Sequence, residues 1–371
     1  MSITTTAAVA RPGAESFTWE TVHLEDPRPD ELLVRVVAVG LCHTDLSVLD
    51  GKLPSMLPGV LGHEGVGVVE AVGSGVTSAA PGDKVLLTFT SCGHCTACLT
   101  GRPTQCQTFF TSNFRNTRQD GSTPVSDVYG TPLGGQFFGQ SSLAHHAVVS
   151  ESSVVRVSAT DEELPMLAPI GCGIQTGAGA VLNVLRPAPG QSVAVFGAGA
   201  VGLSAVMAAR LTGATRIIAV DRLPSRLDLA RELGATHVVN SAEEDLPKRL
   251  AELSDGIGVA HAVETTGVTA VLEQAIAGIA PDGTVAVVGA PAAGSRASFD
   301  VLALLDGRRV LGVIEGGSDR VTFIPALLEL HRQGRLPYDR LVRFYRPDQL
   351  DEAVAEARRG RTLKPVIRFD S

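Results

Sequence analysis

Two groups of potential metal ligands account for all six cysteines of this chain. Four cysteines lie in the segment SCGHCTACLTGRPTQC with the spacing C-x2-C-x2-C-x7-C: Cys92, Cys95, Cys98 and Cys106. Four clustered thiolates suit a closed, tetrahedral structural zinc site. Cys42 and Cys172 stand in separate segments, with His63 between them along the chain. Two cysteines and one histidine leave a fourth metal position open, which is typical of catalytic zinc.

Each group also has an alternative interpretation. The four clustered cysteines would otherwise be free or disulfide-bonded thiols, or the ligands of a zinc ribbon that binds nucleic acid. His94, inside the cluster, is a further potential ligand, although a solvated turn residue is the favoured interpretation. Cys42 and His63 would otherwise be ordinary core residues. Cys172 lies in a Gly-Cys-Gly turn at an expected domain boundary, where ligand sites are common, and this favours the metal.

Composition limits the classes of function. A chain of 371 residues is too long for one ordinary core and predicts about two domains. The net charge of −8 offers no basic surface for nucleic acid or an anionic membrane. The N-terminal residues lack the pattern of a signal peptide, and no apolar run is long enough to span a bilayer. Thiolates intended for zinc favour a reducing compartment, so we expect a cytoplasmic protein.

The chain changes its hydrophobic pattern near residue 174. Before it, short alternating runs such as 32–39, 65–72 and 144–149 predict β-strands with frequent turns. The polar segment 107–135 shows no clear period and is predicted to be a long surface loop. From 174 to 315, short apolar runs alternate with helix-like stretches: 192–197, 216–220, 237–240, 260–265, 284–289 and 309–314. This alternation predicts an α/β domain with a doubly wound, six-stranded parallel sheet.

The remaining residues, from about 316, hold an amphipathic stretch at 322–333 and a strand-like end, TLKPVIRF. They do not continue the alternation and are expected to return to the first zone. The predicted domains are therefore a β-rich domain of residues 1–173 and 316–371, interrupted by a Rossmann domain of residues 174–315.

A glycine-rich turn follows the first strand of the second zone. Gly197, Gly199 and Gly202 form G-x-G-x-x-G, in which the glycines allow a tight turn, close approach of a pyrophosphate and helix–strand packing. The helix N-terminus would hold the pyrophosphate. Asp221 ends the next strand, 19 residues after Gly202, and would accept the ribose hydroxyls. This favours NAD over NADP, although the neighbouring Arg222 could accommodate a 2′-phosphate.

The run Gly62-His63-Glu64-Gly65-Val66-Gly67, continuing to Gly73 and Val76, resembles the signature of zinc-containing alcohol dehydrogenases of the medium-chain dehydrogenase/reductase superfamily. The likeness covers nearly the whole chain. GLCHTDL (40–46), QFFGQSSLAHHAVV (136–149) and GCGIQTGAGA (171–180) are most similar to bacterial aryl and allylic alcohol dehydrogenases, of the benzyl-alcohol and geraniol type. The resemblance implies a GroES-like catalytic domain, two zinc ions per chain, NAD, and hydride transfer between a primary alcohol and its aldehyde.

The resemblance also assigns roles around the catalytic zinc. It makes Cys42, His63 and Cys172 the ligands and Asp45 the partner of the other His63 nitrogen. Glu64 would lie behind the ligands or bind the metal transiently. Thr44 matches the residue that takes the alcohol proton. Ser47 stands where several relatives continue the relay with a histidine, which puts the outer relay in doubt.

Further residues match cofactor and substrate positions of the family. His43 would face the pyrophosphate, Arg226 the adenosine ribose, and Lys364 a phosphate, although Arg226 and Lys364 could equally be surface charges. Thr176 and Val201 would contact the nicotinamide. The candidates for the substrate wall are apolar or aromatic: Phe89, Phe137, Phe138 and Ile314. Such a wall favours benzylic or allylic alcohols.

Three alternatives remain open. A glutathione-dependent formaldehyde dehydrogenase needs cationic residues at the substrate entrance, and none can be placed. A polyol dehydrogenase often has glutamate where this chain has Cys172. A protein of another class, a zinc- or NAD-binding sensor without turnover, would keep the fold. Relatives pair through the edge strand, here 309–314, so we expect a homodimer, with a tetramer as the alternative, and neither nucleic acid nor membrane as partner.

Overall fold

The computed structural model describes residues 3–369, which divide into two compact units. Unit 1 comprises the described residues of Met1–Cys172, Asp319–Leu328 and Asp339–Ser371, and unit 2 comprises Gly173–Ser318 and Glu329–Tyr338. The C-terminal segment is thus divided: 319–328 and the described residues from 339 on belong to unit 1, whereas 329–338 belong to unit 2. Among residues 3–369, no single helix is long and apolar enough to cross a membrane, although the bent pair Leu164–Gly171 and Gly173–Leu185 would meet both criteria together.

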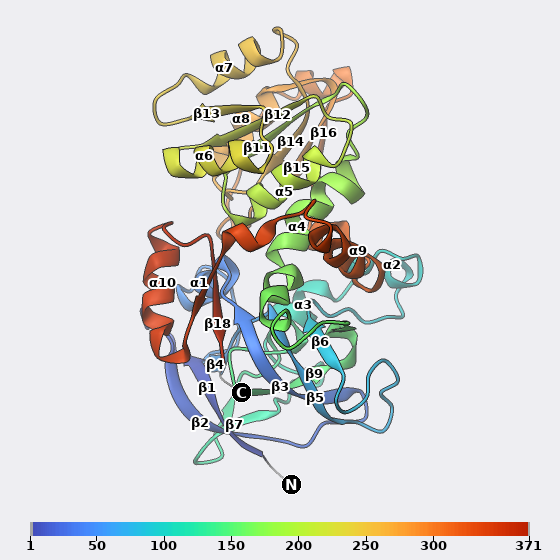
Figure 1. The fold of residues 1–371 in the computed structure, drawn as a ribbon, viewed down its shortest axis with the longest axis vertical. Coiled ribbons are helices and arrows are strands. Elements are labelled where there is room, and N and C mark those ends of the chain that lie inside the picture. The colour runs from blue at the N-terminus through green and yellow to red at the C-terminus, as the bar shows by residue number, and fades with distance from the viewer. Residues whose placement is uncertain (1–2, 370–371) are drawn as a thin grey trace. The chain divides into compact units, whose positions relative to one another are not determined.

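Unit 1 is built mainly from two sheets (Figure 1). The first sheet has the strand order β4-β1-β2-β7-β8: Gly59–Val60, Ile3–Ala10, Thr18–Leu24, Val125–Asp127 and Pro132–Leu133. The second has the order β10-β6-β5-β3-β18-β17, with β9 also paired to β3: Val154–Arg156, Lys84–Leu87, Gly65–Val72, Glu31–Gly40, Lys364–Arg368, Val342–Tyr345 and His146–Ser150. Strand β18 pairs with β3 antiparallel, which explains why the chain's end completes this unit.

The helices of unit 1 are short and lie in its connections: α1 (His43–Leu49), α2 (Thr96–Leu99), α3 (Phe109–Phe114) and α10 (Leu350–Arg358). The amphipathic stretch predicted near the C-terminus is α9 (Arg320–Arg332), whose residues 320–328 belong to unit 1 and 329–332 to unit 2. It buries Ile324, Leu327 and Leu328. This spacing of three and four residues places the apolar side chains on one face of the helix.

The prediction of a surface loop over 107–135 was wrong. This segment contains α3, β7 and β8, and β7 pairs with β2. Its polar side chains bond inside the protein: the guanidinium of Arg118 donates to both carboxylate oxygens of buried Glu31, at 2.7 and 2.8 Å. Buried Asn116, whose φ is 64°, donates to the carbonyl oxygens of Met56 and Val60. Polar residues that satisfy buried partners show no hydrophobic period, which is why the sequence pattern was misleading.

Unit 2 contains the predicted six-stranded parallel sheet, in the order β13-β12-β11-β14-β15-β16. The strands are His237–Asn240, Arg216–Asp221, Ser192–Phe196, Val259–Glu264, Ile279–Val287 and Arg309–Gly312. The helices are α4 (Gly173–Gly179), α5 (Ala200–Arg210), α6 (Pro224–Leu233), α7 (Leu246–Leu253) and α8 (Thr269–Ala277). The strand order reverses direction beside β11, where dinucleotides bind in sheets of this kind.

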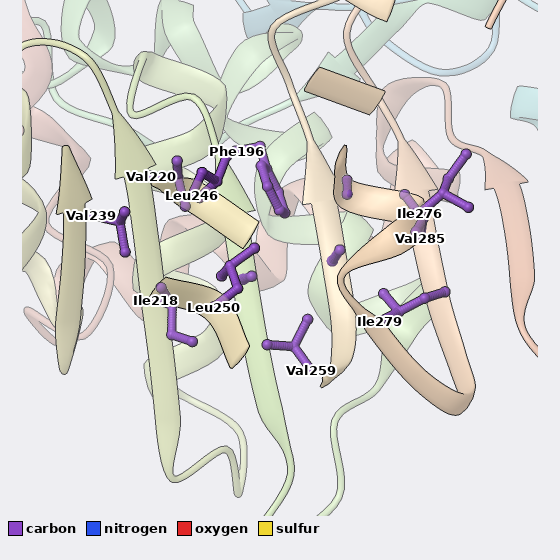
Figure 2. Close-up of a cluster of buried hydrophobic side chains, with 13 residues drawn as sticks. Phe196, Ile218, Val220, Val239, Leu246, Leu250, Val259, Ile276, Ile279 and Val285 are labelled. Atoms are coloured by element: carbon purple, nitrogen blue, oxygen red, sulfur yellow. The ribbon is translucent and has the colours of Figure 1, made fainter. Parts of the chain in front are cut away.

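The core of this sheet explains its near-continuous apolar strands. Figure 2 shows Phe196, Ile218, Val220 and Val285 of the strands together with Leu250 of α7, all buried in one cluster. The intervening residues of β11, such as Val193 and Val195, are buried as well. A parallel sheet covered on both faces has no polar side, so its strands carry no alternation.

Candidate active site

Three predicted ligands meet in unit 1. The ligand atoms of Cys42, His63, Cys172 and Glu64 all lie within 4.8 Å of one another. Cys42 precedes α1, His63 follows β4, and Cys172 ends a 3₁₀ stretch that begins at Leu164. Gly62 is required here because it has a φ of 90° and a Cβ would lie 2.4 Å from the Leu143 nitrogen. The fold thus brings together side chains that are up to 130 residues apart (172 − 42) in sequence.

Asp45 orients the histidine. Its Oδ1 lies 3.0 Å from His63 Nδ1 and also accepts from the Gly62 backbone N–H, while its Oδ2 accepts from the Cys42 N–H. Asp45 and His63 are both fully buried. One carboxylate therefore fixes the two segments that carry Cys42 and His63. The predicted Asp45–His63 contact is present.

The surroundings of the other ring nitrogen of His63, Nε2, show whether a zinc ion would fit this site. His63 Nε2 is buried and has no hydrogen-bond partner among the described residues. An unpaired buried nitrogen is costly unless another group binds it. The ligand atom of His63 lies within 4.8 Å of the Cys42 and Cys172 sulfurs, and two sulfurs with one imidazole nitrogen make the donor set of a catalytic zinc.

The thiols are electronically suited to bind a cation. None of the six cysteines forms a disulfide. Hydrogen bonding to Cys172 holds the pKa of the Cys42 thiol well below its ordinary value, against the opposing effect of burial, with help from the positive charge of Lys364. The thiolate is the form of cysteine that binds metals. Cys42, Cys172 and His63 therefore fit zinc, which would polarise an alcohol or carbonyl oxygen in the open position.

The position of Lys364 shows that its predicted role, as a phosphate contact or a surface charge, was wrong. Lys364 Nζ lies 2.8 and 2.9 Å from the two carboxylate oxygens of Glu64, and the lysine is only 3% exposed. It is therefore neither a solvated surface charge nor a phosphate ligand at the surface. Burial raises the pKa of Glu64, while the charge of Lys364 acts in the opposite direction. Glu64 lies within reach of the other three ligand atoms, and its carboxylate is already paired with Lys364.

Two of the four predicted wall residues pack against the histidine. The Phe138 ring stacks on His63 with a centroid distance of 4.6 Å and an interplanar angle of 27°, and Phe137 meets it edge-on at 5.5 Å. Phe89 is also fully buried, but it packs on Phe109 and lies under the guanidinium of Arg320. Ile314 belongs to unit 2 and is half-buried. Within unit 1, Phe137 and Phe138 are the candidate wall residues that contact a metal ligand.

Helix α1 carries the three remaining residues predicted on this side. Thr44 Oγ1 lies 3.8 Å from Cys42 Sγ. Ser47 is half-buried one turn later, and its carbonyl oxygen accepts from the N–H groups of Lys52 and Leu53. His43 is exposed. Thr44 is thus the hydroxyl group of this helix that lies beside a metal ligand.

Gln140 was not predicted as part of the site. It is fully buried, its amide nitrogen donates to the carbonyl oxygens of His63 and Thr88, and its amide oxygen accepts from the Gly65 N–H. It therefore fixes the backbone on both sides of Glu64. Gln140 lies in QFFGQSS, a segment matched to the family as a whole, and no spacing rule marks a glutamine for such a role.

The second cysteine group is also assembled. The sulfur atoms of Cys92, Cys95, Cys98 and Cys106 lie within 4.8 Å of one another. The backbone N–H groups of Cys92 and Cys95 donate to the sulfurs of Cys106 and Cys92. His94 is exposed and bonds the Cys92 carbonyl, so it is not part of the cluster, as expected.

The surroundings shift the pKa values of two of these thiols in opposite directions. Backbone hydrogen bonds from Cys98 and Gln107 lower the pKa of Cys95 to about 6, whereas burial and its neighbours raise the pKa of Cys98 to about 12. Like charges this close oppose one another's ionisation unless a positive charge lies between them. Four thiolates in this arrangement fit a structural zinc.

The glycine loop of unit 2 has the form that its sequence predicted. Gly197 has a φ of 94°, and a Cβ on Gly202 would lie 1.7 Å from the Gly197 carbonyl oxygen. A Cβ on Gly199, by contrast, would meet nothing within 4 Å. The first glycine makes the turn, the third allows the helix to pack, and the middle one faces free space. That space adjoins the N-terminus of α5, which suits a pyrophosphate.

Asp221 lies at the end of β12 beside this loop. Its Oδ2 accepts from the Ala198 N–H at 2.7 Å, and its Oδ1 accepts from the N–H groups of Arg222 and Leu223. Arg226 Nη1 lies 3.6 Å from the same carboxylate, whereas the Arg222 side chain is exposed. Thr176 and Val201 are half-buried on α4 and α5, and a Cβ on the adjacent Gly177 would lie 2.0 Å from the Val201 carbonyl oxygen.

Comparisons with known proteins agree with this arrangement. Residues 28–159 match the alcohol dehydrogenase GroES-like domain, and residues 200–330 match the zinc-binding dehydrogenase family. The chain is 44% identical over 369 residues to a geraniol dehydrogenase from Castellaniella defragrans, covering 99% of this chain and 98% of the relative.

Solved structures give the same result. A zinc-binding-domain alcohol dehydrogenase from Burkholderia ambifaria has a TM-score of 0.96 at 52% identity, with full coverage of both chains. Benzyl alcohol dehydrogenase from Acinetobacter calcoaceticus has a TM-score of 0.94 at 45% identity, covering 99% of this chain and 100% of the other. The predicted fold class agrees with these relatives, and the predicted zinc agrees with the zinc-binding dehydrogenase family. This chain belongs to the zinc-binding alcohol dehydrogenase family, with a GroES-like domain and a Rossmann domain.

Proposed function

We propose that this protein oxidises benzylic and allylic primary alcohols to their aldehydes with NAD⁺, and catalyses the reverse reduction. The observation that carries the proposal is the unpaired Nε2 of His63, in a ligand cluster with two sulfurs, while Phe138 and Phe137 pack against the ring. The geraniol and benzyl alcohol dehydrogenases among the relatives support the same substrate class. An apolar aromatic wall favours such substrates by burying their rings or double bonds.

In this proposal Cys42, His63 and Cys172 hold the catalytic zinc, and Cys92, Cys95, Cys98 and Cys106 hold the structural one. Bound there, the catalytic zinc would supply Lewis acidity that acidifies an alcohol hydroxyl, and NAD⁺ would supply the hydride acceptor. Thr44 takes the alcohol proton at its hydroxyl group, beside Cys42. Ser47 stands where several relatives have the histidine that receives the proton next, so in this protein water carries the proton from Thr44 to the solvent. Asp45 keeps the Nδ1 proton on His63, which leaves Nε2 free to bind metal.

Unit 2 supplies the cofactor site. The free space at Gly199 and the N-terminus of α5 receive the pyrophosphate, and Asp221 receives the adenosine ribose hydroxyls. An anionic carboxylate at that position repels a 2′-phosphate, which supports NAD rather than NADP. We assign catalysis to residues 1–173 and 316–371, and cofactor binding to 174–315.

A homodimer in the cytoplasm is the assembly and location that we propose. Strand β16 lies at the edge of the parallel sheet, and all four of its residues are exposed. Apolar side chains at Val310 and Leu311, together with Leu302 and Leu305 nearby in the chain, are exposed too. An unpaired edge with apolar side chains is suited to pairing with a second copy. Light scattering of the purified protein tests the dimer.

The decisive experiment measures NADH formation with benzyl alcohol, geraniol and ethanol in parallel, in protein with a known zinc content. We expect kcat/KM for benzyl alcohol and geraniol to exceed that for ethanol by at least about tenfold, equivalent to about 1.4 kcal/mol. Phenanthroline should abolish activity, and added zinc should restore it. A zinc-loaded protein that oxidises none of the three would contradict the proposal and favour a sensor.

A further inference from the structure

The loop Val313–Ser318 follows β16 in unit 2. All six strands of the sheet run parallel, so this loop leaves the sheet at the same edge as the glycine loop that follows β11. The Val313 N–H still bonds the Val287 carbonyl oxygen at 2.9 Å. Ligands of such sheets bind outside the carboxyl ends of the strands. The loop therefore belongs to the edge at which the cofactor site lies.

The backbone of this loop is unusual. Glu315, Gly316 and Gly317 are successive residues with positive φ, at 47°, 65° and 58°. Glycine adopts this conformation freely, whereas a glutamate disfavours it because its Cβ crowds the backbone. A Cβ on Gly316 would lie 2.2 Å from the Gln175 carbonyl oxygen. Close packing therefore demands glycine at 316, but nothing in the backbone demands glutamate at 315.

The side chain of Glu315 explains why it is tolerated. It is only 5% exposed, and its Oε2 accepts from Gln175 Nε2 at 3.0 Å and from Thr176 Oγ1 at 3.5 Å. Gln175 is fully buried, and its Oε1 accepts from Ser318 Oγ at 2.9 Å. These bonds link both ends of the turn to α4. A residue held in a sparsely populated conformation persists when its surroundings fix it in this way.

Helix α4 is in turn fixed to the glycine-loop helix α5. Ser204 Oγ donates to the Ile174 carbonyl oxygen at 2.7 Å, and Gly177 allows the two helices to meet at Val201. A continuous series of contacts therefore runs from the loop after β16, through α4, to the helix that follows the glycine loop. Thr176 lies in its middle.

We propose that Glu315 is a positioning residue for the nicotinamide end of the cofactor. Its carboxylate orients the Thr176 hydroxyl and holds the left-handed turn that follows Ile314, so it acts through these two neighbours. The inference rests on the proposed function, because it requires a nicotinamide cofactor at this edge of the sheet. Glu315 lies outside the glycine loop and outside both groups of zinc ligands, so neither motif predicts a role for it in cofactor binding.

The test uses full-length, zinc-loaded protein and measures the NADH dissociation constant by fluorescence, with NAD⁺ KM and kcat in parallel. Glu315→Gln keeps the shape of the side chain but removes its charge. Hydrogen bonds to charged groups are stronger than neutral ones, so we expect the dissociation constant and KM to rise about fivefold. The melting temperature should remain within about 3 °C of the wild-type value, because the amide oxygen of glutamine can still accept from Gln175 and Thr176.

A double-mutant cycle separates positioning from general support of the fold. If Glu315 acts partly through Thr176, the Thr176→Val/Glu315→Gln variant should bind NADH less weakly than the sum of the two single effects predicts. Asp282→Asn is the matched control. Asp282 is an acidic residue of unit 2 with a φ of 59°, but it is exposed and pairs with Arg309 at the start of β16. We expect this control to leave NADH affinity unchanged.

Three outcomes would overturn the inference. If Glu315→Gln binds NADH as tightly as a wild-type protein that binds it normally, the role of Glu315 is contradicted but the proposed function is not. Fully additive effects of Glu315→Gln and Thr176→Val contradict the action through Thr176. A wild-type protein that binds no NADH contradicts the proposed function and the inference together.

Discussion

Asp45 Oδ1 lies 3.0 Å from His63 Nδ1, and neither side chain is exposed to solvent. The same carboxylate accepts from the N–H groups of Cys42 and Gly62. It therefore sets the tautomer of the histidine and the relative position of two proposed metal ligands. Removing a carboxylate that is hydrogen-bonded to a metal-binding histidine typically lowers metal affinity by roughly 10- to 100-fold.

The first prediction follows from this contact. Asp45→Asn keeps the shape of the side chain but replaces one acceptor oxygen with a donor, so we expect zinc affinity to fall by roughly 10- to 100-fold. A competition titration with a chelator measures this loss. Asp50→Asn, at the end of the same helix and exposed, should retain wild-type affinity. Equal zinc affinities for the Asp45 variant and the wild type would argue against the orienting role.

A second prediction concerns the buried pair of Lys364 and Glu64. Lys364→Met leaves the Glu64 carboxylate buried without its cation, which typically costs about 3–5 kcal/mol of folding stability. Urea unfolding of the zinc-loaded protein measures the change. In the double variant Glu64→Gln/Lys364→Met both charges of the pair are removed, so most of the stability should return. A double variant as unstable as Lys364→Met would show that the charge is not the cause.

A third prediction separates two hydroxyl groups on α1. Thr44 lies beside Cys42, whereas Ser47 is one turn further along. Thr44→Val should lower kcat by about 10²- to 10⁴-fold, the usual range for a proton-transfer group, with zinc content unchanged. Ser47→Ala should change kcat by less than about threefold, since proton transfer through water replaces it. Similar, severe losses in both variants would indicate a relay that continues through Ser47.

A fourth prediction tests the choice of cofactor. Both carboxylate oxygens of Asp221 accept backbone N–H groups beside the glycine loop. Asp221→Asn removes the negative charge that repels a 2′-phosphate, so the ratio of kcat/KM for NADP to that for NAD should rise at least about tenfold, or about 1.4 kcal/mol. Asp228→Asn, an exposed change on α6, is the control. A constant ratio would remove Asp221 from the specificity argument.

The sequence by itself determined the features whose chemistry is local. The four clustered cysteines, the glycine loop and the six apolar strands of unit 2 each occupy one short segment, and all six predicted strands are present. Strand periods and turn residues depend on neighbours a few positions away, which is why a single sequence predicts them. The Cys42, His63 and Cys172 set is dispersed, and it was assigned through family resemblance rather than through spacing.

Only the tertiary structure decided which distant polar groups pair with one another. Lys364 meets Glu64 across 300 positions of sequence, and Arg118 meets Glu31 across 87. Phe138 stacks on His63, and Glu315 reaches Gln175 and Thr176. A buried charge needs a partner, but many residues along a chain can supply one, and the folded path of the backbone selects among them. For this reason Lys364 looked like a surface or phosphate-binding charge in the sequence and proved to be the buried partner of Glu64.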